Sequence, residues 1–333
     1  DNSQTEDSIP RVTYLRENII ATNSNSTTNT NNMVHHSAEA TIYEESNSTN
    51  TNKYQDIQNN ETKQREDFRD YSNCSSTVKN FYKLHNSKQT YEYVSDIQKK
   101  LFSFDSSNVH SIDRLLEIIE EIVDDSDPDF EKGYQIFHNL QAAESARILH
   151  PDKDWFHLVG FIHDLGKVLL HKDLHNLPSW SVVGDTFPVG CAFSKKLIFS
   201  EYFEMNLDRH NSKYNTELGV YSKNCGFENL LMAFGHDEYM YQILLANQRG
   251  KERFPKEALY IVRFHSFYAW HSFGEYKHLA NEFDMEMLPL LKDFQLCDLY
   301  SKTQPDREKL KDQLPYYRDL IRKYICADDM LII

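Results

Sequence analysis

The chain has 333 residues and a formal net charge of −15, from 36 Lys and Arg against 51 Asp and Glu. This acidic balance argues against nucleic acid or an anionic membrane surface as the main partner, because both favour basic protein faces. Five scattered cysteines without CxxC spacing indicate a reducing compartment rather than a disulfide framework or a zinc knuckle. No apolar run reaches the length of a membrane span. We therefore expect a soluble, cytoplasmic monomer with no nucleic-acid or membrane partner.

Residues 1–60 are dominated by Asn, Ser and Thr, as in ATNSNSTTNTNN. Such a segment buries too little apolar surface to offset its chain entropy, so we expect a disordered tail. The composition changes near Thr62, and helical patterns then follow one another without an internal repeat or a strand-rich region. The sequence therefore predicts an all-α fold with a single helical domain over residues 61–333.

The first helical patterns lie between the tail and an acidic cluster. One helix is predicted over residues 78–102, and a second follows Ser111, a suitable N-cap for the pattern IDRLLEIIEEIV. The second helix ends at the acidic cluster DDSD, which starts at Asp124 and lies where the helix macrodipole disfavours negative charge. Either solvent screens this cluster or a positive or hydroxyl-rich group meets it.

The remaining helices are predicted from apolar residues at helical spacing. They span residues 134–149, 154–167, 229–247, 255–271, 288–300 and 315–326. Residues 175–194 are punctuated by Pro and Gly, which predicts an ordered loop or a short hairpin. Gly184 and Asp185 in that loop are candidate ligand contacts.

The segment DWFHLVGFIHDLGK, from Asp154 to Lys167, is central to the functional interpretation. Asp154 is its predicted N-cap, and the segment is apolar up to Ile162 before it turns into His163 and Asp164. A buried imidazole and carboxylate are costly to desolvate unless they are paired. A metal ion would satisfy both, whereas the alternative is a hydrogen-bonded core histidine with Asp164 as its partner. The dipeptide alone does not decide, since it recurs at positions 236 and 237.

Other helices supply further candidates of the same chemical type. The full set of four imidazoles and two carboxylates is His138, His163, Asp164, His236, His265 and Asp298. If they converge inside a helical bundle they form a dinuclear site, with the carboxylate beside a histidine as the bridge. Nitrogen and oxygen ligands without thiolate suit iron, manganese or zinc, and ligand type does not choose among them. On the residues alone, the dinuclear site and the core-histidine interpretation both stay open.

The other histidines, of 15 in all, have separate interpretations. His157 is predicted to be a hydrogen-bonded core histidine, and His271 competes with His265 for the ligand role. Those in polar or terminal settings are expected at the surface: His85, His110, His150, His171, His175, His210 and His278.

The order of His138, His163-Asp164 and Asp298 resembles the H…HD…D pattern of HD-domain proteins, an all-helical metal-binding superfamily. Longer strings resemble the blocks of the myo-inositol oxygenase family, in that family's order. These strings are VDDSDPD, DWFHLVGFIHDLGK, WSVVGDTFPVGC, FGHDEYMYQ, RFHSFYAWH and CDLYSK. Several long, uncommon strings together are far more specific than one HD pair. The resemblance implies an HD-domain-like helical bundle with a diiron centre in a mixed-valent Fe(II)/Fe(III) state.

The resemblance also implies roles for individual residues. One iron would be held by His138, His163, Asp164 and Asp298. The other would be held by the bridging Asp164 with His236 and His265. The residues implied to bind myo-inositol are Arg69, Asp124, Lys167, Gly184, Asp185, Ser266 and Lys302. The implied activity, part of inositol catabolism, is cleavage of the inositol ring with O2 as co-substrate to give D-glucuronate, with Asp164 and Lys167 as catalytic residues.

Two other functions compete with this one. Relatives with the same H…HD…D ligands hydrolyse phosphate esters, so an HD-type metal-dependent phosphohydrolase is the alternative enzyme. Phosphate substrates favour several Arg or Lys in the pocket, whereas Asp124 and Asp185 join the expected lining here. The third possibility is a catalytically inactive ligand-binding module, and the presence of all six ligands argues against it.

Overall fold

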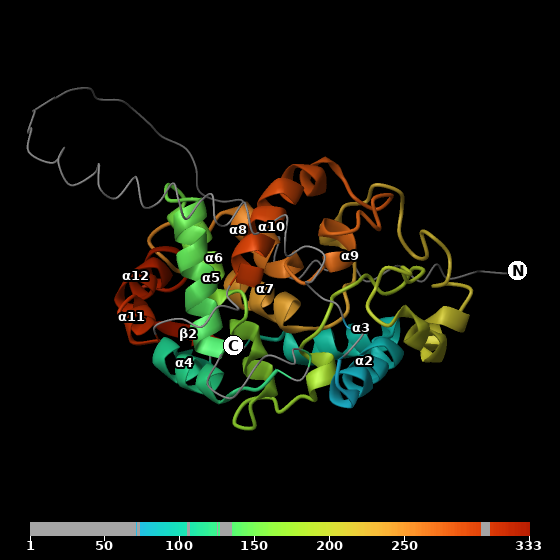
Figure 1. The fold of residues 1–333 in the computed structure, drawn as a ribbon, viewed down its shortest axis with the longest axis horizontal. Coiled ribbons are helices and arrows are strands. Elements are labelled where there is room, and N and C mark those ends of the chain that lie inside the picture. The colour runs from blue at the N-terminus through green and yellow to red at the C-terminus, as the bar shows by residue number, and fades with distance from the viewer. Residues whose placement is uncertain (1–70, 72–73, 105–106, 125, 127–134, 301–306) are drawn as a thin grey trace, which may run out of the picture. The chain divides into compact units, whose positions relative to one another are not determined.

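A computed structural model describes residues 71, 74–104, 107–124, 126, 135–300 and 307–333. These residues are mainly helical (Figure 1), which confirms the predicted helical fold. The predicted tail over residues 1–60 and its boundary at residue 61 lie outside the described residues. Within the described ranges, no helix combines the length and the apolar character that crossing a membrane requires.

The first two helices are α2 (Ser76–Lys88) and α3 (Tyr91–Leu101), so the single helix predicted over residues 78–102 is wrong. The chain breaks between them because Thr90 caps α3 with its side chain. The side chain of the preceding Gln89 is fully buried and exchanges two hydrogen bonds with the backbone of Phe234. A distant partner therefore fixes a break that apolar periodicity does not reveal.

The next helix, α4 (Ile112–Glu121), begins as predicted after Ser111, whose hydroxyl accepts a hydrogen bond from the backbone of Arg114. Just before it, β1 (Val109–Ser111) pairs antiparallel with β2 (Met330–Ile332) near the end of the chain. Strands of three residues are too short to leave a periodic pattern, so the sequence gives no signal for this small sheet.

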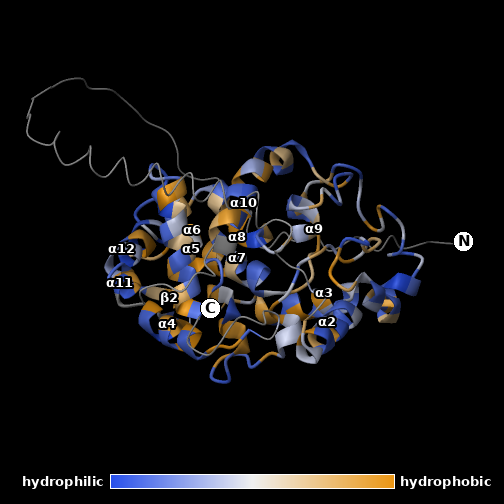
Figure 2. Ribbon diagram, viewed as in Figure 1, coloured by the Kyte–Doolittle hydropathy of each residue, from blue (hydrophilic) through white to orange (hydrophobic). Residues whose placement is uncertain are grey.

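A pair of closely packed helices, α5 (Gln135–Leu149) and α6 (Asp154–Ile162), lies beside α10 (Glu282–Tyr300) (Figure 1). A Cβ atom at Gly160 would lie only 2.6 Å from the Cα atom of Ala143, so this glycine allows the close approach of α5 and α6. The ribbons of these helices carry hydrophobic and hydrophilic segments in turn (Figure 2), as expected for helices with one face in a common core.

The central segment differs from the single helix predicted over residues 154–167. Asp154 is the first helical residue rather than the N-cap, and its carboxylate accepts hydrogen bonds from Lys323 and Tyr324. The α-helix ends at Ile162, and the chain continues as the 3-10 helix η1 (Leu165–Leu170). Side chains three residues apart eclipse one another in 3-10 geometry, which brings the side chain of residue 167 above that of residue 164.

The described chain contains several further helical elements. They are α7 (His236–Ala246), α8 (Lys256–Phe264), α9 (Tyr268–His271), α11 (Arg307–Lys311) and α12 (Leu314–Tyr324), with the 3-10 helices η2 (Ser179–Ser181), η3 (Ser200–Met205), η4 (Leu207–His210) and η5 (Phe227–Asn229). The helix predicted over residues 229–247 starts only at residue 236, because residues 231–233 are extended and bond the backbone of residues 187–189. The same contacts show that residues 175–194 form an ordered loop rather than a local hairpin.

Two other predicted helices also have different bounds. The one predicted over residues 255–271 is divided into α8 and α9 at His265. The one predicted over residues 288–300 begins earlier, at Glu282, where Asn281 and Asp284 exchange hydrogen bonds in the manner of a capping box.

Candidate metal centre

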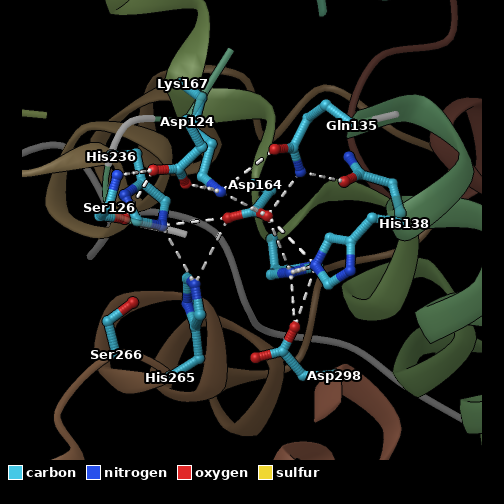
Figure 3. A network of polar contacts seen from close by, with 12 residues as sticks. Asp124, Ser126, Gln135, His138, Asp164, Lys167, His236, His265, Ser266 and Asp298 are labelled. Carbon is cyan, nitrogen blue, oxygen red and sulfur yellow. Dashed lines mark hydrogen bonds and ion pairs between the residues drawn. The ribbon is translucent and has the colours of Figure 1, made fainter. Parts of the chain in front are cut away.

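The six ionisable residues chosen from the sequence converge around Asp164, as Figure 3 shows for His138, His236, His265 and Asp298. They come from separate elements: α5 carries His138, α6 is followed by His163 and Asp164, α7 begins with His236, α8 is followed by His265, and α10 carries Asp298. The first five are buried, and the side chain of Asp298 is 13% exposed. Such a concentration of polar groups in an apolar core requires mutual pairing or a metal ion.

Asp164 lies between two pairs of imidazoles. Its Oδ2 atom is 3.3 Å from Nε2 of His138 and 3.4 Å from Nε2 of His163. Its Oδ1 atom is 3.1 Å from Nε2 of His236 and 3.8 Å from Nε2 of His265. The two Nε2 atoms within each pair are 3.3 Å and 3.2 Å apart. Each carboxylate oxygen therefore faces its own pair of nitrogen ligands.

These separations fit two metal ions that share one carboxylate. Donor atoms about 2.1 Å from one ion and about 90° apart are about 3 Å from each other. Two groups could each hold an ion, with donor atoms within 4.8 Å of one another: His138 with His163 and Asp164, and Asp164 with His236 and His265. Oδ1 of Asp298 adds a further donor to the first group, 3.0 Å from Nε2 of His138. The donor set contains no thiolate, so it suits iron, manganese or zinc.

The outer nitrogens of three imidazoles are held by backbone carbonyls. Nδ1 of His163 donates to the carbonyl of Gly160 at 2.9 Å, and Nδ1 of His265 donates to the carbonyl of Val262 at 2.9 Å. Both carbonyls belong to the last turn of the preceding helix, where they lack a helical partner. Nδ1 of His236 donates to the loop carbonyl of Val182 at 2.8 Å. A proton on Nδ1 leaves the Nε2 lone pair directed at the centre and available to a metal.

Lys167 is a buried cation held between carboxylates. Its Nζ atom lies 2.8 Å from Oδ2 of Asp124 and 3.0 Å from Oδ2 of Asp164. Burial alone would lower the pKa of Lys167, but these two carboxylates raise it well above its usual value. Burial would likewise raise the pKa of Asp164, whereas Lys167 and the adjacent imidazole of His163 lower it. The side chain of Lys167 therefore stays charged beside the carboxylate of Asp164.

Asp124, the first residue of the acidic cluster after α4, contacts the side chain of Lys167. Asp124 is 5% exposed and pairs with Lys167, so solvent does not screen it. Its Oδ1 atom also accepts hydrogen bonds from the backbone N–H and the hydroxyl of Ser126. Of the two interpretations given to this cluster, contact with a positive group therefore holds for Asp124.

The other residues expected to bind substrate are distributed as follows. Asp185 and Ser266 are buried, and the backbone N–H of Thr186 donates to the carbonyl of Ser266 at 3.0 Å. This bond joins the loop with Gly184 and Asp185 to the turn that follows His265. Arg69 and Lys302 lie outside the described residues.

Two polar residues of the centre were missed in the sequence. Gln135, the first residue of α5, donates from Nε2 to Oδ2 of Asp164 at 2.7 Å and accepts from Nζ of Lys167 at 3.2 Å. Asp237 lies behind His265, with Oδ1 3.0 Å from Nδ1 of that ring. The repeated His-Asp dipeptide at positions 236 and 237 was the available signal for Asp237. No comparable sequence signal marked Gln135, because a helical glutamine is ordinarily a surface residue.

The remaining histidines correct part of the surface assignment. His85 is 2% exposed rather than at the surface, because the face of α2 that carries it packs against the loop carbonyls of Trp180 and Asp185. His171 is also buried, beside Glu121.

The two histidines with separate interpretations, His157 and His271, are both buried. His157 is confirmed as a core histidine, bonded to the hydroxyl of Tyr316 and the carbonyl of His150. His271 donates from Nε2 to the backbone carbonyl of His265, and it belongs to neither of the two groups that could hold a metal ion.

Comparisons with known proteins find the same family along most of the chain. The sequence profile of the family described as myo-inositol oxygenase matches residues 75–331. An inositol oxygenase of Dictyostelium discoideum is 48% identical over 267 residues, which cover 79% of this chain and 89% of that protein. Inositol oxygenases of Danio rerio and Rattus norvegicus are 46% and 43% identical, over 79% and 81% of this chain and 92% of each relative. The resemblance first seen in short strings is thereby confirmed over most of the sequence.

Proposed function

Because the chain belongs to the myo-inositol oxygenase family, we propose that it cleaves the ring of myo-inositol with O2 to give D-glucuronate. The proposal includes two irons per chain, in a mixed-valent Fe(II)/Fe(III) state. The observation that carries it is the position of Asp164, which presents one carboxylate oxygen to each of two imidazole pairs. The relatives named as inositol oxygenases also support the proposal.

The proposed ligands divide into two groups. His138, His163, Asp298 and Oδ2 of Asp164 would hold one iron. Oδ1 of Asp164, His236 and His265 would hold the other. Two bound irons supply Lewis acidity toward vicinal hydroxyls and one-electron chemistry with O2. The adjoining apolar core, which includes the fully buried Phe294, limits the access of bulk water to this chemistry.

The pair formed by Lys167 and Asp124 is suited to a neutral polyol. A hydroxyl is both a donor and an acceptor, so one placed between the two side chains accepts from Nζ of Lys167 and donates to the carboxylate of Asp124. Because Lys167 keeps its proton, its charge stabilises negative charge that develops on a substrate oxygen. In this proposal Asp185 and Ser266 contact the other hydroxyls of the ring.

The competing function is an HD-type phosphohydrolase. A phosphate dianion favours a site rich in Arg and Lys. Here the charge of Lys167 is already matched by the carboxylates of Asp124 and Asp164. Asp185 is a further buried acid, in the loop that bonds the backbone of Ser266. The named relatives also support the oxygenase over the phosphohydrolase.

The decisive experiment is O2 uptake by the iron-loaded protein with myo-inositol, with the product identified by mass. We expect uptake that depends on inositol, D-glucuronate as the product, and a mixed-valent diiron spin-resonance signal. Asp164→Ala should lose the iron and the uptake together. A matched control is Asp152→Ala, which removes a carboxylate that is 76% exposed and should leave both unchanged.

Three results would contradict the proposal. Phosphate release from nucleoside monophosphates without O2 would favour the phosphohydrolase. A purified protein that binds no metal would favour the inactive ligand-binding module. Two irons retained by Asp164→Ala would refute the bridging role.

A further inference from the structure

Asp237 is a buried carboxylate that lies behind both imidazoles of one pair. It is the second residue of α7 and is 1% exposed. Its Oδ1 atom is 3.0 Å from Nδ1 of His265 and accepts a hydrogen bond from the backbone N–H of Ser266 at 3.2 Å. Its Oδ2 atom is 3.6 Å from Nδ1 of His236 and accepts no hydrogen bond from the described residues.

The first turn of α7 explains how such a carboxylate is tolerated. Free N–H groups at a helix N-terminus favour negative charge, and Asp237 occupies that turn. The backbone N–H of Ser266 and the two imidazoles provide the remaining stabilisation. A carboxylate placed in this way connects the start of α7 to the turn between α8 and α9.

His163, in the other imidazole pair, has a different environment. Asp237 lies beside the Nδ1 atoms of His236 and His265, which also donate to backbone carbonyls, whereas Nδ1 of His163 donates to the carbonyl of Gly160. The carboxylates of Asp164 and Asp298 face its Nε2 atom instead. In addition, Nζ of Lys167 lies 3.0 Å from Oδ2 of Asp164, the oxygen on the side of His163. A carboxylate beside Nδ1 therefore distinguishes His236 and His265 from His163.

A carboxylate behind a metal-bound imidazole fixes the ring and increases the basicity of its ligating nitrogen. We propose that Asp237 is a positioning residue for the metal held by His236 and His265, and that it makes this site bind its metal more strongly. The inference rests on the two-metal centre of the proposed function. It adds a residue outside the ligand set and predicts that the two metal sites respond differently to its loss.

The test is anaerobic titration of the full chain with Fe(II) against a competing chelator, which yields two dissociation constants. Asp237→Asn retains the size of the side chain and an oxygen that can accept from Nδ1 of His265 and from the backbone of Ser266, but it removes the charge. We expect one constant to weaken by about 10- to 100-fold while the other is unchanged. Should this variant fail to fold, Asp237→Ser, which is smaller and keeps an oxygen, replaces it with the same expectation.

The matched control is Glu238→Gln, at the next residue of α7. Glu238 is also buried, but its carboxylate bonds Arg263 at 2.6 Å and Gln242 at 2.8 Å instead of the metal ligands. We expect this control to lower the free energy of unfolding and to leave both dissociation constants unchanged.

The outcomes separate this inference from the proposed function. If Asp237→Asn binds both metals like the unmodified chain, or weakens both equally, the inference is wrong. It is also wrong if Glu238→Gln weakens one site to the same extent, since the effect would then be a general loss of structure. If the unmodified chain does not bind two metals, the proposed function itself fails.

Discussion

Gly166 lies at a close backbone contact between η1 and the start of α7. A Cβ atom at this position would lie 2.2 Å from the carbonyl oxygen of His236, 2.9 Å from its carbonyl carbon and 3.0 Å from its Cα. All three are backbone atoms, so no side chain can rotate to relieve the contact. Ordinary van der Waals contact at 3.4 Å requires one segment to move by about 1 Å.

Gly166→Ala should therefore disturb the centre as well as the fold. Overpacking of this kind costs about 1–3 kcal/mol in the free energy of unfolding. The displacement would separate Nε2 of His236 from Oδ1 of Asp164, which are now 3.1 Å apart. If metal binding has to oppose the same strain, the affinity of one metal site falls by about 5- to 150-fold.

The assay combines denaturant unfolding of the metal-free protein with metal titration. Gly274→Ala is the control, because its Cβ meets no atom within 4 Å although its φ is +68°. Left-handed backbone costs a non-glycine residue about 1–2 kcal/mol, so the control should lose stability without losing metal affinity. If Gly166→Ala changes neither the free energy of unfolding nor the metal affinity, the two backbone segments move apart without cost and the reasoning is refuted.

Three further predictions concern charge and metal. Lys167→Met leaves the buried carboxylates of Asp124 and Asp164 without their cation, so the free energy of unfolding of the metal-free protein should fall by about 3–5 kcal/mol. Urea unfolding measures this loss, and an unchanged midpoint would contradict it. Although burial would lower it, the carboxylates of Asp164 and Asp298 raise the pKa of His138 from 6.5 to about 9. Its protonation therefore stabilises the metal-free protein fully below pH 6.5, and this contribution is lost as the pH rises through about 9. Metal must displace that proton, so metal affinity should rise over the same pH range, and a flat profile would be inconsistent with the site. Removal of the metal by a chelator should lower the melting temperature, because free metal at 100 times its Kd stabilises a fold by about 2.7 kcal/mol. Equal melting temperatures with and without metal would exclude a bound ion.

The chemistry of the centre could be predicted from residue identity. His163 and Asp164 follow an apolar run, and a buried imidazole next to a buried carboxylate requires a partner wherever the chain folds. The sequence also offered a second His-Asp dipeptide at positions 236 and 237. Composition and periodicity do not distinguish the two carboxylates. In the structure, Asp164 faces both imidazole pairs and Asp237 lies behind one of them.

The helix ends could not be predicted, because tertiary contacts determine them. Apolar periodicity continues past Ile162 and past Phe264, yet both helices end there and a histidine follows. In each case the imidazole donates to a carbonyl of the last helical turn. The same limit applies to His85, whose burial depends on a loop about 100 residues away in the chain.

The central claim is that Asp164 bridges two irons, and anomalous diffraction at the iron edge from iron-loaded crystals tests it directly. We predict two peaks about 3.5–4 Å apart, as in other two-metal sites. One should lie among His138, His163 and Asp298, the other between His236 and His265, and both should contact the carboxylate of Asp164. A single peak, or two peaks of which only one contacts Asp164, would contradict the account.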